Sequence, residues 1–95
     1  MRFEWDDEKA VENLQKHGVS FGEATEVFYD PNAIEGYDKQ HSADEARFFI
    51  IGLSSRRLLY VVYAERDDDV VRIIMTRKAS KAEREIYERT ASINL

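Results

Sequence analysis

A chain of 95 residues with 43% hydrophobic residues fits one domain spanning 1–95, and five Tyr, five Phe and one Trp suffice for a packed core. The absence of cysteine excludes disulfides and thiolate zinc sites, and no apolar run approaches the roughly 18 residues of a membrane span, so a cytoplasmic protein is expected. The net charge of −5 is uneven: residues 1–45 carry four Lys/Arg and twelve Asp/Glu, residues 46–95 ten and seven, so a phosphate-binding surface is expected in the second half.

The first third of the chain predicts a short strand followed by two helices. Phe3-Glu4-Trp5 alternates like an edge strand, and Asp6 or Asp7 caps a helix that ends at Gly18. A second helix begins at the capping box of Ser20 and Glu23 and ends at Asp30-Pro31. The apolar stripes of these helices are Ala10, Val11 and Leu14 on the first, and Phe21, Ala24, Val27 and Phe28 on the second.

The remainder predicts four strands and a helix. Ala33–Tyr37 is a weak strand candidate, and a polar loop follows it from Asp38 to Asp44. Three apolar strands then form an antiparallel meander, the last two joined at the turn Asp67–Asp69, and a capping box at Ser80 opens the final helix. These strands span Phe48–Ile51, Leu58–Ala64 and Val70–Met75. The order β-α-α-β-β-β-β-α predicts an α+β fold, with an antiparallel sheet flanked by an N-terminal helix pair and a C-terminal helix.

Few kinds of catalytic site fit this sequence. His17 and His41 lie in separate segments without metal-ligand spacing, the four glycines form no phosphate loop, and no serine has a local base. We therefore expect neither a metal nor a cofactor. Arg, Lys, His, Glu and Tyr side chains remain, and these can cleave RNA without a metal when cations stabilise the phosphate while an acid and a base move protons.

The hairpin around the Asp67–Asp69 turn holds the strongest candidates. Tyr63 and Glu65 share one face of their strand by alternation. A two- or four-residue loop would place Arg72 on that face as well, whereas a three-residue loop would place it on the other. Arg77, five residues after Arg72, would join it only beyond the strand's end or after a bulge. The plain alternative is that these are solvated surface charges.

Other candidate residues could have a structural role instead of a functional one. Lys16 and His17 end a helix, where positive charge offsets the helix dipole, and His41 lies in a polar loop. Arg84 and Tyr87 share a helix face that could meet a phosphate or a partner, although Tyr87 could equally pack on the sheet. Trp5 fits a core residue or a base-stacking one. The candidate substrate-binding residues are Lys16, Tyr63, Arg84 and Tyr87.

Several segments between residues 2 and 88 carry a family resemblance. They are Phe3-Glu4-Trp5-Asp6, Asn13-Leu14, Lys16 to Phe21, Ala24, Val27-Phe28, Asp30-Pro31, Asp38, His41-Ser42, Arg47-Phe48, Ile51 to Ser54, Glu65-Arg66, Arg72 to Ile74, Arg77 to Ala79, Glu83-Arg84 and Tyr87-Glu88. In order and spacing they resemble the BrnT family, ribonuclease toxins of type II toxin–antitoxin modules. One departure is Met75-Thr76 before Arg77, where the family usually has Ser-Ala.

The resemblance implies a RelE-like fold and an endoribonuclease that cleaves RNA without a metal and arrests growth. It implies a BrnA-like antitoxin whose ribbon-helix-helix part binds DNA, so that the toxin meets DNA only indirectly. It also implies roles: Arg72 and Arg77 as a phosphate clamp, Glu65 as proton acceptor, and His17 or His41 as proton donor.

Two further hypotheses stay open beside an active toxin. The chain's acidity favours a catalytically weak interaction module that binds the antitoxin and supports repression of its operon. Cleavage on the ribosome, as in RelE, is the other. A homodimer of the free chain is also conceivable, formed through the surface that an antitoxin would cover.

Overall fold

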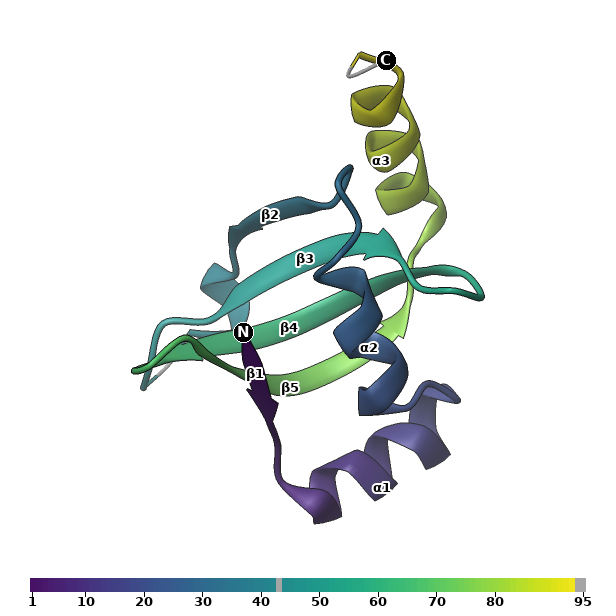
Figure 1. The fold of residues 1–95 in the computed structure, drawn as a ribbon. Coiled ribbons are helices and arrows are strands. Elements are labelled where there is room, and N and C mark those ends of the chain that lie inside the picture. Colours follow the sequence, from purple (N-terminus) through teal and green to yellow (C-terminus); the bar gives the residue numbers. More distant parts are fainter. Residues whose placement is uncertain (43, 94–95) are drawn as a thin grey trace.

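The computed structural model describes residues 1–42 and 44–93, except the side chains of His41 and Ile93. The predicted order of elements is confirmed, with one added 3-10 turn, η1 (Figure 1). The elements are β1 (Arg2–Glu4), α1 (Asp7–His17), α2 (Phe21–Val27), β2 (Ile34–Tyr37), η1 (Lys39–His41), β3 (Phe48–Leu53), β4 (Leu58–Arg66), β5 (Val70–Lys78) and α3 (Lys81–Ile93). Within the described residues, no helix has the length and apolar character needed to span a membrane.

The five strands form one sheet in the order β1-β5-β4-β3-β2. The predicted meander is confirmed and extended, because β2, β3, β4 and β5 pair antiparallel in sequence order. The short β1 adds to β5 in parallel, a pairing that alternation alone does not reveal. In Figure 1, α2 crosses one face of the sheet, α1 lies beside it, and α3 extends away from the far end.

The helix ends follow the capping signals of the sequence. The Asp6 carboxylate accepts hydrogen bonds from two amides of the first turn of α1, at 2.9 and 3.1 Å, and Gly18 ends that helix at φ +70°. Ser20 caps α2 through the Glu23 amide at 3.0 Å. At α3, the Glu83 amide donates to the Ser80 hydroxyl and the Ser80 amide donates to the Glu83 carboxylate. All three predicted helix starts are confirmed.

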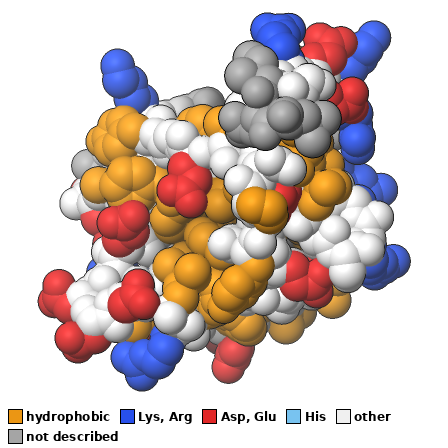
Figure 2. All heavy atoms as spheres, turned by 45° about the horizontal axis from the view of Figure 1, so that its top comes forward, with side chains coloured by type: hydrophobic (Ala, Val, Ile, Leu, Met, Phe, Trp, Pro, Cys, Tyr) orange, Lys and Arg blue, Asp and Glu red, His pale blue; other side chains and the backbone are white. Residues whose placement is uncertain are grey.

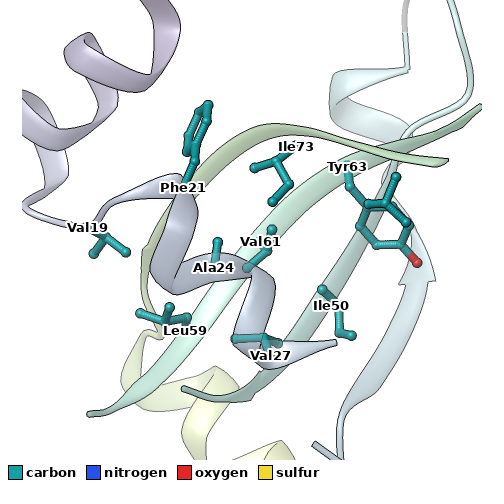
Figure 3. Close-up of a cluster of buried hydrophobic side chains, with 10 residues drawn as sticks. Val19, Phe21, Ala24, Val27, Ile50, Leu59, Val61, Tyr63 and Ile73 are labelled. Atoms are coloured by element: carbon teal, nitrogen blue, oxygen red, sulfur yellow. The ribbon is translucent and has the colours of Figure 1, made fainter. Parts of the chain in front are cut away.

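The main core lies between α2 and the sheet (Figure 3). We call this side of the sheet the α2 face, defined by Leu59, Val61 and Tyr63 of β4. The buried members of the cluster are Val19, Phe21, Ala24, Val27, Ile50, Leu59, Val61, Tyr63, Val71 and Ile73. The opposite side, the α3 face, is the one on which Ile51 and Leu58 pack against Tyr87. Burial on both faces explains why β3 and β4 are apolar in nearly every position.

Two irregularities set the register of the β4–β5 hairpin. The turn contains three residues, Asp67–Asp69, and both Asp68 and Asp69 adopt a left-handed backbone with φ +62°. Further along, the pairing shifts between Val62 and Tyr63, whose partners are Met75 and Ile73, so that Ile74 is an extra residue in a β-bulge. Each residue of β5 beyond the bulge therefore faces the side opposite to that expected from simple alternation.

Asn13 joins α1 to the edge of β5. Its side-chain amide donates to the Thr76 and Val19 carbonyls at 2.9 and 3.0 Å, and its carbonyl accepts from the Thr76 amide at 3.1 Å. The side chain thus pairs with Thr76 as a neighbouring strand would. The predicted apolar stripe of α1 is therefore wrong in part: Asn13 is buried, whereas Val11 and Leu14 are 57% and 51% exposed.

The α3 helix is held by a buried tyrosine. The Tyr87 hydroxyl, in a residue only 6% exposed, donates to the Asp30 carboxylate at 2.6 Å. The same carboxylate oxygen accepts from the Leu53 amide at 2.8 Å. Burial and the adjacent Asp30 raise the pKa of Tyr87 to about 12. Tyr87 therefore packs on the sheet, as the structural reading of the sequence expects.

Asn13→Ala should destabilise the fold by about 2–4 kcal/mol, because it leaves buried backbone groups of Thr76 and Val19 without partners. Urea unfolding monitored by circular dichroism measures this change. The exposed neighbour Glu12→Ala is the control and should change the free energy of unfolding by less than about 0.5 kcal/mol. Equal effects of the two substitutions would contradict the role given to Asn13.

Tyr87→Phe should lower the free energy of unfolding by roughly 1–3 kcal/mol at neutral pH, since it removes a hydrogen bond to a carboxylate. The pKa of Tyr87 is raised in the fold to about 12, so this contribution is complete below pH 10 and is lost as the pH rises from 10 towards 12. Urea unfolding of both proteins at pH 7 and pH 11.5 measures the difference, which should shrink at the higher pH. A difference that stays constant would disprove the linkage.

Candidate functional site

The hairpin register separates Glu65 from Arg72. The three-residue turn pairs Glu65 with Val71 and Ala64 with Arg72. Because Tyr63, Val71 and Ile73 belong to the core cluster, Glu65 lies at the rim of the α2 face and Arg72 projects from the α3 face. Of the loop lengths that the sequence leaves open, the structure has the three-residue loop, which places Glu65 and Arg72 on opposite faces.

The bulge brings Arg72 and Arg77 to the same face. Arg77 pairs with Tyr60 across the β4–β5 ladder, and its guanidinium carbon lies 4.2 Å from the centre of the Tyr60 ring. Tyr60 in turn stacks on Phe49, with ring centres 5.6 Å apart and planes 10° from parallel. Arg77 is five positions after Arg72, and the extra residue of the bulge is what places both on the α3 face.

Arg77 is held rigidly in this position. Its guanidinium forms two hydrogen bonds to the Glu83 carboxylate, at 2.8 and 2.9 Å, and a third to the Lys78 carbonyl at 3.2 Å. The Glu83 carboxylate raises the pKa of Arg77. Burial alone would raise the pKa of Glu83, but hydrogen bonds from Arg77 and the Ser80 amide lower it below its ordinary value. The pair therefore fixes the guanidinium plane against Tyr60.

Arg72 is also paired with a carboxylate. Its guanidinium lies 2.7 Å from the Glu4 carboxylate, and β1 places Glu4 directly beside Arg72 in the parallel ladder. The pair is partly exposed, at 30% for Arg72 and 44% for Glu4, so water weakens the attraction. An incoming phosphate would compete with Glu4 for this arginine.

Asp38, directly after β2, also reaches the α3 face. Asp38 is 7% exposed and hydrogen bonds to Tyr60. Burial, then the negative charges of Asp38 and Glu83, raise the pKa of Tyr60 above its ordinary value. The 3-10 turn that follows Asp38 contains His41, whose side chain lies outside the described part of the structure.

Arg47 adds a third guanidinium to this region. It directly precedes Phe48, which pairs with Tyr63 and packs on the α2-face core, so alternation directs Arg47 to the α3 face. Its Nε is buried and has no hydrogen-bond partner among the described residues. Neither Arg47 nor Tyr60 was a predicted site residue. For Arg47 the only signal is its place in the family-like segment, and Tyr60 is concealed within an apolar run.

Lys16 and His17 line a groove beside the bulge. The groove, of about 240 Å³, lies between α1 and β5 and includes Ile74 and Met75. These two residues stand between Arg72 and Arg77 along β5, so the groove adjoins the strand that carries both arginines. Lys16 is exposed and His17 half-buried. The described residues contain no group of three or more His, Asp or Glu side chains that could hold a metal ion.

The remaining predicted residues lie elsewhere. Tyr63 is 3% exposed in the α2-face core, and Tyr87 is buried under α3. Arg84 is exposed on α3, and its guanidinium lies 4.0 Å from the Glu88 carboxylate. Trp5 packs edge-on against Phe21, with ring centres 5.9 Å apart, and has the core role. The structure thus places Arg72 and Arg77 on the α3 face, where Tyr87 also packs, and Lys16 and His17 in the groove beside β5, whereas Glu65 and Tyr63 belong to the α2 face.

Comparisons with known proteins give the family. Among curated proteins there is no match. A similar solved structure is the 1.1 Å crystal structure of the Brucella abortus ribonuclease toxin BrnT, with a TM-score of 0.66 and 21% sequence identity over 85% of this chain and 99% of that one; it shows a shared fold. A family model described as the ribonuclease toxin BrnT of type II toxin–antitoxin systems matches residues 5–83. The chain therefore belongs to the BrnT family of ribonuclease toxins of type II toxin–antitoxin systems.

Proposed function

We propose that this chain is an endoribonuclease that cleaves RNA without a metal, using the α3 face of its sheet. The observation that carries the proposal is the bulge, which places Arg72 and Arg77 on one face beside the groove of His17. In this reaction the 2′-hydroxyl loses a proton, its oxygen attacks the adjacent phosphorus, and the 5′-oxygen leaves with a proton. A 2′,3′-cyclic phosphate and a 5′-hydroxyl are the products.

The two arginines stabilise the charge that gathers on the phosphate oxygens. Arg77 suits this role because its guanidinium is held by Glu83 and Tyr60 before any substrate arrives, so little reorganisation is needed. Arg72 supplies a second cation along the same strand, and Lys16 contacts a neighbouring phosphate of the RNA.

Proton transfer falls to the two histidines. Histidine is the residue type used most often as general acid or base, and His17 is in the groove beside β5. Tyr60 is unsuited to accept a proton, because its raised pKa keeps the hydroxyl protonated at neutral pH. Its role is to hold Arg77. Glu65, on the other face, has no part in this arrangement.

The proposed partners follow from the family. A cognate antitoxin with a ribbon-helix-helix part would inhibit the toxin by covering the α3 face, and would link it to operator DNA. The existence of an antitoxin is implied by a toxin–antitoxin family, and the mode of inhibition is our proposal.

Arg77→Ala should reduce cleavage at least 100-fold, because it removes the preorganised cation. Arg72→Ala should reduce it at least tenfold, since Arg72 is less rigidly held. The assay uses purified protein and 5′-labelled RNA in EDTA, with product ends identified by mass spectrometry. Arg84→Ala, an exposed arginine on α3, is the control and should cleave within twofold of the unsubstituted protein.

Glu65→Gln should leave the rate within about twofold, because Glu65 is on the face away from both arginines. The same RNA assay, run from pH 5 to 9, measures this. A loss as large as that of Arg77→Ala would restore Glu65 as proton acceptor and contradict the site proposed here.

A catalytically weak interaction module remains the second candidate, favoured by one observation. Both Arg72 and Arg77 are already bound to carboxylates, Glu4 and Glu83, with which RNA must compete. Expression of the chain alone in bacteria separates the two functions. Growth arrest relieved by Arg77→Ala supports the ribonuclease, whereas harmless accumulation of folded protein supports the module.

A further inference from the structure

We propose that a pocket on the α2 face, remote from the arginines, binds a basic and partly apolar segment of the cognate antitoxin. This inference rests on the proposed function for the existence of that partner. The pocket has a volume of about 310 Å³ and lies at the hairpin end of the sheet. Its floor is apolar, formed by Phe28, Tyr63 and Val71, and its rim includes the carboxylates of Glu35 and Glu65.

The aromatic floor is rigid. Phe28 meets Tyr63 edge-on with ring centres 5.0 Å apart, and Phe3 meets Phe28 in the same way at 5.3 Å. Tyr63 packs at the end of the core, where its hydroxyl points away from the other labelled side chains (Figure 3). Burial raises the pKa of Tyr63, and the nearby charges of Glu35 and Glu65 raise it further. The pocket is thus preformed.

Arg66 and Met1 also line the pocket, and the cation of each is already paired with a carboxylate. The Arg66 guanidinium lies 3.1 Å from the Glu45 carboxylate, and the N-terminal ammonium of Met1 lies 3.1 Å from Asp69. No salt bridge joins Glu35 or Glu65 to a cation within the described ranges 1–42 and 44–93. The exposed Asp67 and Asp68 of the adjacent turn add two further negative charges. The pocket therefore has an uncompensated negative rim.

Charge complementarity identifies the occupant. A negative rim repels RNA, whose phosphates bind to cationic surfaces, and attracts Arg or Lys. An aliphatic stem can lie on the aromatic floor while its cation meets Glu35 and Glu65, a fit that suits arginine best. Figure 2 shows a face on which hydrophobic side chains form a broad central area with acidic ones among them, while Lys and Arg lie mostly at the margins. A basic, partly apolar protein segment matches the apolar floor and acidic rim of the pocket.

The position of the pocket has a consequence for inhibition. Arg72 and Arg77 lie on the α3 face, whereas the pocket opens on the α2 face. An antitoxin anchored here and covering the arginines must pass around an edge or an end of the sheet. Substitutions in the pocket should therefore affect how the antitoxin is anchored without changing the arginines that it covers.

The test is Glu35→Lys, which reverses one charge of the rim at an exposed position on β2. The matched control is Glu8→Lys, the same charge change at an exposed position on α1. The antitoxin encoded beside this chain is purified and titrated against each full-length toxin variant by calorimetry at low and moderate salt. Glu35→Lys should raise the dissociation constant for the antitoxin at least tenfold, whereas Glu8→Lys should change it less than twofold. Glu35→Gln should give an intermediate loss.

The outcomes separate this proposal from the function on which it rests. Equal antitoxin affinity for Glu35→Lys and Glu8→Lys overturns the docking site, whatever the RNA assay shows. Absence of RNA cleavage by the unsubstituted toxin overturns the ribonuclease proposal, while a selective Glu35→Lys effect would still support docking. Sedimentation of the toxin alone tests whether a second copy of the chain occupies the pocket. A dimer that Glu35→Lys disrupts would identify that second copy as the occupant and overturn the antitoxin assignment.

Discussion

The β-bulge opposite Val62 is the constraint on which the rest of the structure depends. One extra residue, Ile74, reverses the direction of every side chain that follows it in β5. Arg77 thereby reaches Tyr60, and Thr76 is buried where its backbone meets Asn13. Without the extra residue, Arg77 would point to the α2 face and lose Tyr60 and Glu83 together. The bulge therefore sets both the contact of β5 with α1 and the position of the two arginines.

The parts of the fold that were predictable from sequence are those set by local chemistry. Caps at Asp6, Ser20 and Ser80 locate all three helices, and apolar runs locate the meander. Register was not predictable, because Asp67–Asp69 contains neither a Gly nor an Asn to specify a turn type, and the structure places two aspartates at φ +62° there. The buried side of α1 was also missed, since Asn13 is polar and its partners are backbone groups 63 residues away.

The residues of the candidate site likewise divide into those that the sequence revealed and those that it did not. The arginines were recognisable by residue type and family resemblance. Whether Arg72 and Arg77 share a face of the sheet was correctly expected to depend on the turn length and on a possible bulge. Tyr60 was not recognisable, because alternation is hidden where both faces of a strand are buried. Glu65 shows why the turn length had to stay open: it is close to Arg72 along the hairpin, yet their side chains lie on opposite faces of the sheet. Proximity along a hairpin thus identifies neighbours only once the turn length is known.

The contact between Asn13 and Thr76 also bears on how chains of this kind avoid one another. A strand at the border of a sheet normally offers free N–H and C=O groups to any extended segment nearby, which is a common origin of aggregation. Beyond the short β1, the border of β5 at Thr76 is occupied by a side-chain amide in place of another strand. The helix that follows β1 therefore protects this border against strand addition through a single side chain.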